Sequence, residues 1–372
     1  MPENTALWIK VKRGPFVVGP APYTAPGPHE IVIRVRAVAV NPVDRLQQTL
    51  GDMFTPWTRY PFVVGSDVAG EVVEIGSGVS RFQAGDRVVG YAGGSDKGRN
   101  RAAEGAFQDY VVLLDHMTSP IPESLSFEAA SVIPLGVSTA ACGLFQQDFL
   151  GLNAPSAAPA PTGRTLIIWG GSTSVGSNAI QLAVAAGYDV VTTSSPRNFA
   201  YVKGLGAREA FDYNAKSVVR DIVHSLKGRE IAGALAIGPG SAAACIEIVG
   251  QCKGRRFVSM ASAPTSWDAV PAGRGRIFRL VPALLRMITG SIGLAWLARR
   301  RKVRTRMIWG SALVANEVGP MIFEDFLPAA LAAARFVAAP GPQVVGEGLA
   351  QIPVALERQR QGVSAAKLVV TL

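Results

Sequence analysis

The residues from Leu166 to Gln181, LIIWGGSTSVGSNAIQ, combine an apolar strand pattern, a glycine-rich turn and a helical pattern. Gly170, Gly171 and Gly176 allow a tight turn that points the N–H groups of the helix's first turn at an anion. A phosphate-binding P-loop would have Lys and then Ser or Thr after its last glycine, whereas Ser and Asn follow here. The segment therefore favours a dinucleotide pyrophosphate over phosphoryl transfer, with a plain strand-to-helix turn as the alternative.

The residues after the next strand pattern, Val190 to Thr193, bear on which dinucleotide is bound. A site for NAD has an acidic residue about 20 residues after the glycine-rich turn, where it binds the ribose 2′-OH. This chain has Ser-Ser-Pro-Arg-Asn from residue 194 to 198 and no carboxylate. Two hydroxyls, a guanidinium and an amide suit a 2′-phosphate, so we predict NADPH as the cofactor. Ser195 and Asn198 are also residue types that cap helices, and both roles can coexist.

Few side chains in this chain could bind a metal or form disulfides. Its three cysteines have no Cys-x-x-Cys spacing, and it has only three histidines. Neither a zinc cluster nor a disulfide framework is expected, which favours a reducing compartment. The first residues lack the apolar run of a signal peptide, and no run of about 18 uncharged apolar residues occurs. The sequence thus predicts a cytoplasmic protein.

The elements that must position these residues fall into two parts. A length of 372 residues, with 48% hydrophobic and 17% charged residues, suits two folded domains. The first third alternates short apolar runs with turn residues, which indicates an antiparallel β domain. From Arg164 onward strands alternate with helices, which indicates a parallel, doubly wound sheet. Beyond residue 321 we expect a helix over 322–337, a strand near 343–345, a helix over 348–361 and a final strand over 367–372.

Several motifs, in this order, resemble the medium-chain dehydrogenase/reductase superfamily and its zinc-free branch of quinone oxidoreductases and enoyl reductases. They are NPVD at 41–44, GSDVAGEVVEIG at 65–76, GDRV at 85–88, GAF at 105–107, STA at 138–140 and GGSTSVG at 170–176. The run from Ser194 to Tyr213 is similar to fungal-type stand-alone reductases, including trans-acting enoyl reductases that partner polyketide synthases. The resemblance implies an α/β fold with a GroES-like β-barrel catalytic domain (residues 1–134 and 337–372) and an inserted Rossmann NADP-binding domain (residues 135–336).

The resemblance also implies site residues, in a cleft between the two domains. Asn41, Asp44 and Thr139 are the catalytic candidates: Asn41 would position substrate or nicotinamide, Asp44 would fix its turn, and Thr139 would lie beside the nicotinamide or pyrophosphate. The implied cofactor-binding residues are Ser172, Thr173, Ser174 and Val175 at the phosphates, Ser194, Ser195, Arg197 and Asn198 at the 2′-phosphate, Tyr213 on the adenosine side, and Met260 and Ala261 near the nicotinamide.

Zinc-dependent members of the superfamily carry a cysteine in the first motif, a histidine in the second and a cysteine before the Gly-x-Ser-Thr segment. Asn41, Ser66 and Leu135 stand in these regions here. A catalytic zinc ion needs about three protein ligands from Cys, His, Asp or Glu, so we predict no metal.

The absence of a Lewis acid favours conjugate reduction over the reduction of simple ketones, because an enolate can be stabilised by hydrogen-bond donors. We therefore expect an NADPH-dependent, zinc-independent reductase of the EC 1.3 or 1.6 class. Its small-molecule substrate would be an activated alkene (enone or enoyl or other acyl thioester) or a quinone. The alternative is an NADPH-binding, non-catalytic sensor or scaffold.

A basic cluster follows an apolar segment between Phe278 and Arg306. Its residues are Arg299, Arg300, Arg301, Lys302, Arg304 and Arg306, within a chain of net charge +10. It is either a solvated basic face or a docking site, over residues 299–306, for a membrane surface or an acyl carrier partner. No nucleic-acid partner is expected, because aromatic residues are not interleaved with the basic ones. Both a monomer and a homodimer are compatible with the sequence.

Overall fold

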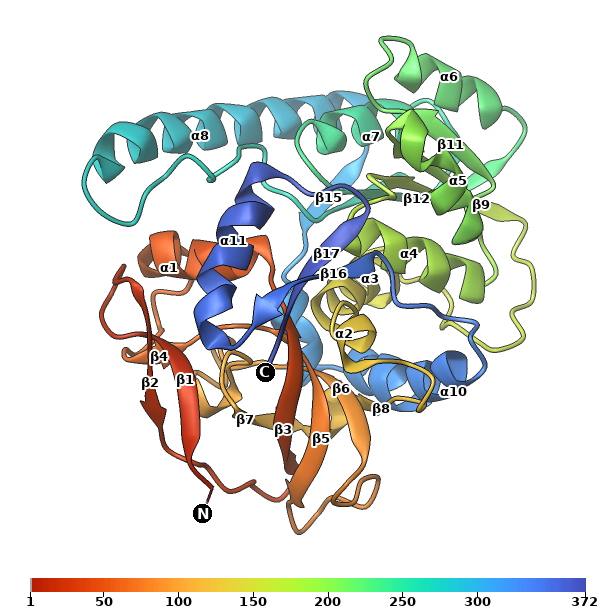
Figure 1. The fold of residues 1–372 in the computed structure, drawn as a ribbon. Helices are drawn as coiled ribbons and strands as arrows, with labels where there is room; N and C mark the ends of the chain where they lie inside the picture. Colours follow the sequence, from red (N-terminus) through yellow and green to blue (C-terminus); the bar gives the residue numbers. More distant parts are fainter. Residues whose placement is uncertain (1) are drawn as a thin grey trace. The chain divides into compact units, whose positions relative to one another are not determined.

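The computed structural model describes residues 2–372, which form two compact units (Figure 1). Unit 1 contains the chain up to Leu135, the short segment Val270–Arg276, and Ser311–Leu372. Unit 2 contains Gly136–Ala269 and Ile277–Gly310. The predicted α/β fold is confirmed.

Unit 1 is built on a mostly antiparallel sheet to which both chain ends contribute. The strand order is β16-β17-β3-β5-β6-β8, and β7 also pairs with β3. The bounds are β3 Glu30–Ala39, β5 Asp67–Ile75, β6 Arg87–Tyr91, β7 Tyr110–Leu114, β8 Thr118–Pro120, β16 Gly341–Glu347 and β17 Ala366–Thr371. Figure 1 shows the blue C-terminal strands beside the red and orange N-terminal ones. The pairing of β17 with β3 closes the sheet with residues from the far end of the chain.

Shorter elements complete unit 1. A three-stranded sheet has the order β2-β1-β4, with β1 Asn4–Ile9, β2 Phe16–Ala21 and β4 Phe62–Val63. The helices are α1 Pro42–Phe54, α2 Phe127–Ala130, α9 Val318–Pro320, α10 Leu327–Ala332 and α11 Ile352–Gln361. Apolar residues of β1, β3, β5 and α11 pack into one core. The β-branched runs of the first third thus form an antiparallel β domain, as predicted, and β3 is buried on both of its faces.

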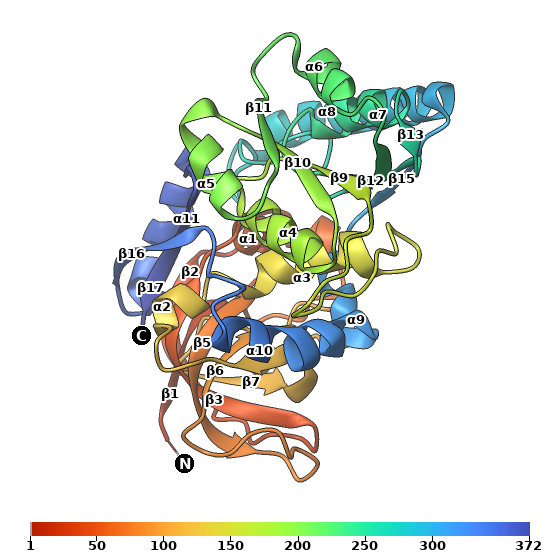
Figure 2. The same ribbon diagram turned by 90° about the vertical axis from the view of Figure 1, so that its right-hand side faces the viewer.

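Unit 2 is a parallel sheet with the strand order β11-β10-β9-β12-β14-β15. The strands are β9 Arg164–Trp169, β10 Asp189–Ser194, β11 Glu209–Asp212, β12 Glu230–Ala236, β14 Phe257–Met260 and β15 Arg304–Met307, with β13 Lys253–Gly254 beside β12. The helices are α3 Pro134–Phe145, α4 Ser174–Ala185, α5 Phe199–Gly204, α6 Val218–Ser225, α7 Ser241–Val249 and α8 Arg276–Arg301. Figures 1 and 2 show α6, α7 and α8 on one face of the sheet and α4 and α5 on the other. Helices on both faces explain why β9 and β12 are almost entirely apolar and buried.

Two expectations about the segment after residue 310 need correction. Residues 311–336 belong with unit 1 and not with the dinucleotide-binding part, so the return to unit 1 comes at Ser311 and not at residue 337. Ser311 donates to Asp96, and Arg81 bonds to Glu324, which ties the segment to unit 1. The helix expected over 322–337 is shorter, because a π-helical turn, Met321–Phe326, leads into α10. Pro328 in the first turn of α10 has no N–H to continue regular α-helical bonding.

Candidate active site

The glycine-rich turn lies at the carboxyl end of β9, and its helix, α4, begins at Ser174. Thr173 caps that helix: its Oγ1 accepts from the Gly176 N–H at 3.0 Å and donates to the Gly170 carbonyl at 2.8 Å. Ser174 and Val175 form the first turn, where backbone N–H groups have no intrahelical acceptor. The positive end of α4 and these amides therefore suit a pyrophosphate.

Two glycines allow the turn to be this tight. A Cβ on Gly176 would lie 2.2 Å from the Gly170 carbonyl oxygen, and a Cβ on Gly171 would lie 2.2 Å from Thr192 Oγ1. Both distances are far below a van der Waals contact, so a side chain at either position would push α4 away from the sheet. The glycines thus hold the helix start against the strands, the arrangement that a dinucleotide cradle requires.

The Ser-Ser-Pro-Arg-Asn segment begins at the end of β10, the strand beside β9. Ser194 is fully buried, and Asn198 Nδ2 donates to Ser195 Oγ at 3.2 Å. Arg197 is exposed at the end of this strand. Ser194 thus ends β10, Ser195 precedes the short 3-10 turn Pro196–Asn198, and Arg197 and Asn198 lie in that turn, at the same sheet edge as the glycine-rich turn.

The remaining predicted cofactor residues also lie at the carboxyl edge of this sheet. Tyr213 follows β11 and is about half exposed, while Met260 ends β14 and Ala261 donates its N–H to Ala236. Ser262 accepts a hydrogen bond at 2.8 Å from the N–H of Gly238, in the loop after β12. This loop was not among the predicted site residues, although Gly-Pro-Gly after a buried strand is a turn signal.

Thr139 lies on α3, which packs against the start of α4. A Cβ on Gly136 would lie 2.6 Å from both Ser174 Oγ and Asn178 Nδ2, so this glycine brings the helices together. Thr139 is partly exposed one turn further on, next to Gly310. The neighbouring Ser138 hydroxyl is buried without a hydrogen-bond partner within the structure. Thr139 is thus placed on the helix that borders the phosphate cradle, within unit 2.

Asn41 and Asp44 come together in unit 1 with two residues that the sequence analysis did not select. Asp44 accepts the Asn41 backbone N–H at 2.8 Å, which fixes the start of α1 as expected. Asn41 Nδ2 donates to Asp67 at 2.6 Å, and Lys367 Nζ binds the same Asp67 oxygen. The Leu135 N–H donates to the other Asp67 oxygen at 2.5 Å. All four side chains, Asn41, Asp44, Asp67 and Lys367, are at least 95% buried.

The buried Asp67–Lys367 pair joins residues 300 positions apart. Asp67 is part of the motif at 65–76, which supported the resemblance but did not lead us to predict a role for Asp67. The signal for Lys367 was a lone cation in the apolar run of the last strand, since a buried lysine must be paired. Lys367 Nζ also donates to the Val132 carbonyl at 3.2 Å, so its charge is well satisfied.

A small pocket opens beside this network in unit 1. Its lining includes Val43, Asp44, Gln47, Ser66 and Ser95. Tyr91 is buried nearby; burial first, and then the Asp67 and Asp96 carboxylates, raise its pKa, while a hydrogen bond with Ser66 opposes them. The Tyr91 phenol therefore remains protonated. The side chains of Gln47, Ser66 and Ser95 give the pocket wall both hydrogen-bond donors and acceptors.

Two of the three positions that correspond to zinc ligands in the resemblance, Asn41 and Leu135, contact Asp67. Asn41 and Leu135 donate to its carboxylate, and the ammonium group of Lys367 neutralises it. Over residues 2–372, no three His, Cys, Asp or Glu side chains are grouped to hold a metal ion. The positive charge beside the Asp67 carboxylate is thus the ammonium group of Lys367.

We expect the buried Asp44 to make stability depend on pH. Burial raises the pKa of its carboxyl to about 8 from an ordinary 3.8, with Asp67 adding to the rise and the Asn41 N–H opposing it. The folded protein therefore keeps a proton that the unfolded chain loses near pH 4. This contribution to stability is complete below about pH 4 and is lost as the pH rises through about 8, at up to about 1.4 kcal/mol per pH unit.

Asp44→Asn should remove this slope and retain the acceptor for the Asn41 N–H. In urea unfolding at several pH values, the free energy of unfolding of the variant should increase relative to that of the wild type as the pH rises. Asp86→Asn is the matched control, because Asp86 accepts the Gln83 N–H at 2.9 Å in the same local geometry but is partly exposed. Parallel curves for wild type and Asp44→Asn would contradict the prediction.

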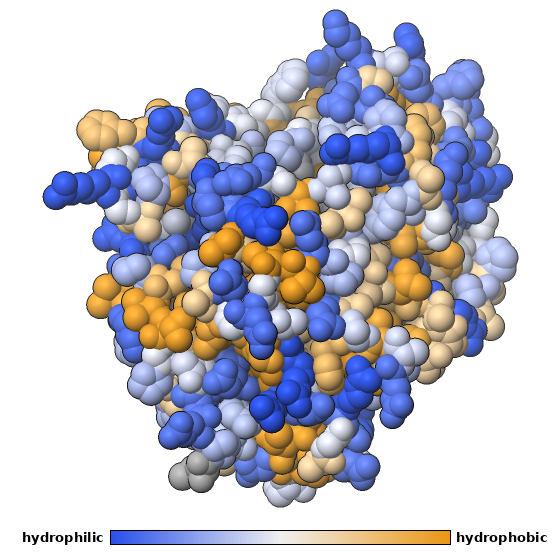
Figure 3. Space-filling model, viewed as in Figure 1, coloured by the Kyte–Doolittle hydropathy of each residue, from blue (hydrophilic) through white to orange (hydrophobic). Residues whose placement is uncertain are grey.

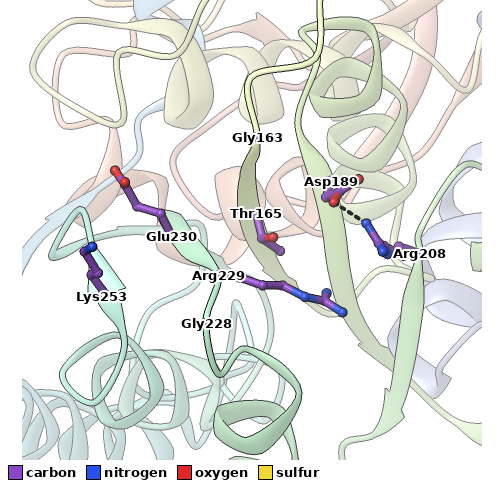
Figure 4. Close-up of a pocket in the computed structure, with 8 residues that line it drawn as sticks. All are labelled: Gly163, Thr165, Asp189, Arg208, Gly228, Arg229, Glu230 and Lys253. Atoms are coloured by element: carbon purple, nitrogen blue, oxygen red, sulfur yellow. Dashed lines mark hydrogen bonds and ion pairs between the residues drawn. The ribbon is translucent and has the colours of Figure 1, made fainter.

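A depression in unit 2 lies at the opposite sheet edge from the glycine-rich turn. Figure 4 shows its lining, in which Asp189 points to Arg208 and forms an ion pair with it at 2.5 Å. Thr165, Asp189 and Glu230 are at the amino ends of β9, β10 and β12. Since ligands of doubly wound sheets bind at the carboxyl ends, this polar depression is not the cofactor site.

Comparison with known proteins agrees with the geometry. The alcohol dehydrogenase GroES-like domain matches residues 27–123. Dehydrogenase pigH of Monascus ruber is 50% identical over 374 residues, covering 100% of both chains. Trans-enoyl reductase himH of Aspergillus japonicus is 37% identical, covering 99% of this chain and 97% of the relative. The quinone oxidoreductase of Coxiella burnetii has the same fold, with a TM-score of 0.66, 21% identity and full coverage of both chains.

A GroES-like unit with an inserted dinucleotide-binding unit defines a two-domain oxidoreductase that uses a nicotinamide cofactor. The chain belongs to the medium-chain dehydrogenase/reductase superfamily, and the relatives that it matches over their full length include proteins named dehydrogenase and trans-enoyl reductase.

Proposed function

We propose that the protein is an NADPH-dependent, zinc-independent reductase of activated alkenes or quinones. The observation that carries the cofactor choice is the turn after β10, where Ser194, Ser195, Arg197 and Asn198 stand at the position of the acidic residue of NAD sites. Arg197 supplies a guanidinium for bidentate binding of the 2′-phosphate, and the hydroxyls and amide supply further donors. Ser172 to Val175 would hold the pyrophosphate.

When bound, NADPH supplies a hydride to an electron-poor carbon. The protein's part is to position the acceptor and to stabilise the negative charge that develops on its oxygen. Thr139 would contact the cofactor, as the resemblance implies, and the hydrogen bond from Asn41 to Asp67 would fix the orientation of the Asn41 side chain. Enones, enoyl thioesters and quinones suit such a site, because their reduced oxygen can be stabilised by hydrogen-bond donors alone.

The buried Lys367–Asp67 pair supports independence from zinc. Asn41 Nδ2 and the backbone N–H of Leu135 donate to Asp67, and these N–H groups are not metal ligands. The Lys367 ammonium group already neutralises the Asp67 carboxylate. The names of relatives support the proposed substrate class: himH is named a trans-enoyl reductase, and the Coxiella protein a quinone oxidoreductase.

The test is NADPH oxidation by protein dialysed against a chelator, with a panel of enones, acyl thioesters and quinones. We expect turnover of at least one class at a rate that chelation does not change. Loss of activity on chelation with recovery on adding zinc would refute the metal-free mechanism. Tight NADPH binding without turnover of any acceptor would instead favour a non-catalytic, cofactor-binding protein.

A further inference from the structure

Helix α8 presents large apolar side chains to solvent along its length. Two segments, Phe127–Phe145 and Arg276–Arg301, are long and apolar enough to cross a membrane by length and composition. The first is 72% buried within the protein and is a core segment, whereas α8 is only 11% buried. Phe278 is 80% exposed, Ile292 65% and Trp296 61%. A soluble surface helix would normally carry polar residues at these positions.

The exposed apolar residues form one stripe. Six of them are Phe278, Val281, Leu285, Ile288, Ile292 and Trp296, and Ile277 lies next to Phe278. Their spacing of three or four residues places them on one side of the helix, which is about 39 Å long at 1.5 Å per residue. The view in Figure 3 shows hydrophobic and hydrophilic side chains next to each other at the N-terminal end of α8. We call this surface the α8 stripe.

The charged residues of α8 and of the segments that flank it in the sequence are all basic. No Asp or Glu occurs between Asp268 and Glu317. The exposed basic residues from Arg274 to Lys302 are Arg274, Arg279, Arg286, Arg299, Arg300 and Lys302. At 100° per residue, Arg279, Arg286 and Arg300 lie along one flank of the stripe. Arg300 also stacks over the ring of Trp296, 5.4 Å from its centroid.

The opposite side of α8 is held by unit 2. Leu294 and Leu297 pack against the core that contains Ala298, and Gly290 lies against Pro264. Arg301 pairs with Glu247 of α7. A membrane-spanning position would break these contacts and place Arg279 and Arg286 in hydrocarbon, so the helix can only lie flat on a surface.

We propose that the α8 stripe binds the surface of an anionic lipid membrane, with the apolar side chains in the acyl boundary and the arginines among the headgroups. An apolar face with a basic flank and no acidic residue is the pattern of an interfacial helix. A symmetric pair of α8 helices would bring arginines together, which disfavours a second copy as the occupant. An acidic protein partner would meet the charges, but the long row of aliphatic side chains offers it no hydrogen-bonding group. The proposal does not depend on the reductase function.

Flotation of the full chain with vesicles tests the proposal. The wild type should float with phosphatidylcholine vesicles that contain about 30 mol% phosphatidylserine and should not float with vesicles of pure phosphatidylcholine. A salt concentration of about 0.5 M should release it from the anionic vesicles. The triple variant Phe278→Ser/Ile288→Ser/Ile292→Ser should lower partitioning at least about tenfold, because each substitution removes the favourable free energy of transferring an apolar side chain from water to the membrane. Arg279→Gln/Arg286→Gln should lower it about fivefold per arginine, which corresponds to about 1 kcal/mol each.

The matched control is Val354→Ser/Arg358→Gln, which removes an exposed apolar residue and an exposed arginine from α11 in unit 1 and should float like wild type. All variants alter exposed side chains, and unchanged thermal unfolding would show that they fold. Absence of flotation, or equal flotation of all variants, would overturn the proposal. So would a dimer in light scattering that the α8 variants break, or binding to an acidic acyl carrier domain in place of vesicles.

Discussion

Replacing Lys367 with Met is expected to lower the free energy of unfolding of unit 1 by about 3–5 kcal/mol, because the variant leaves the Asp67 carboxylate buried without its cation. Asp67 is fully buried, and its remaining donors are Asn41 and the Leu135 N–H. Hydrogen exchange of peptides from β5 and β17 during urea titration would measure the loss in unit 1 separately from unit 2.

Two further variants separate charge pairing from packing. Lys253→Met changes an exposed lysine and should shift stability by no more than about 0.5 kcal/mol. Adding Asp67→Asn to Lys367→Met removes the uncompensated charge and should restore much of the lost stability. If the double variant loses as much free energy of unfolding as the two single variants lose together, the loss comes from packing and not from the charge pair.

The second large effect is expected in cofactor choice. On the proposed NADPH preference, Arg197→Ala should raise the Kd for NADPH about 10- to 150-fold, the equivalent of the 1.5–3 kcal/mol of a charged hydrogen bond. The Kd for NADH should change less than about threefold, because NADH has no 2′-phosphate for Arg197 to bind. Fluorescence titration with both nucleotides gives the two constants.

Arg220→Ala is the matched control, since Arg220 is an exposed arginine on α6 of the same unit that pairs only with its neighbour Asp221. It should bind both nucleotides like wild type. Equal weakening of NADPH and NADH by Arg197→Ala would show that the arginine contacts another part of the cofactor, and no change would remove it from the site.

Short sequence patterns were sufficient to predict the parallel sheet of unit 2 and the glycine-rich turn at its carboxyl edge. The apolar run before Gly170, the glycines themselves and the helix pattern after them lie within 16 residues, so short-range geometry fixed their arrangement. The end of β10 could be read in the same way. The loop at Gly238 was missed because a turn signal alone does not indicate which sheet edge it will border.

The buried network in unit 1 could not be predicted in the same way. Asp67 and Lys367 are brought together by the pairing of β17 with β3 and of β3 with β5, which depends on long-range register. The end of the insert was also placed too late, because residues 311–336 carry helical patterns that fit either unit. The outward stripe of α8 was not foreseen, since periodicity does not tell a helix's buried side from its exposed one.

The position of β17 has a consequence for biosynthesis. Ribosomes make the chain from its N-terminus, so all the strands of unit 2 precede β16 and β17. Unit 2 can close its sheet while the first 135 residues of unit 1 still lack the strand that carries Lys367. During that interval Asp67 has no cation and the edge of β3 is open. We therefore expect nascent unit 1 to be the part of the chain that chaperones must shield until synthesis reaches the last strand.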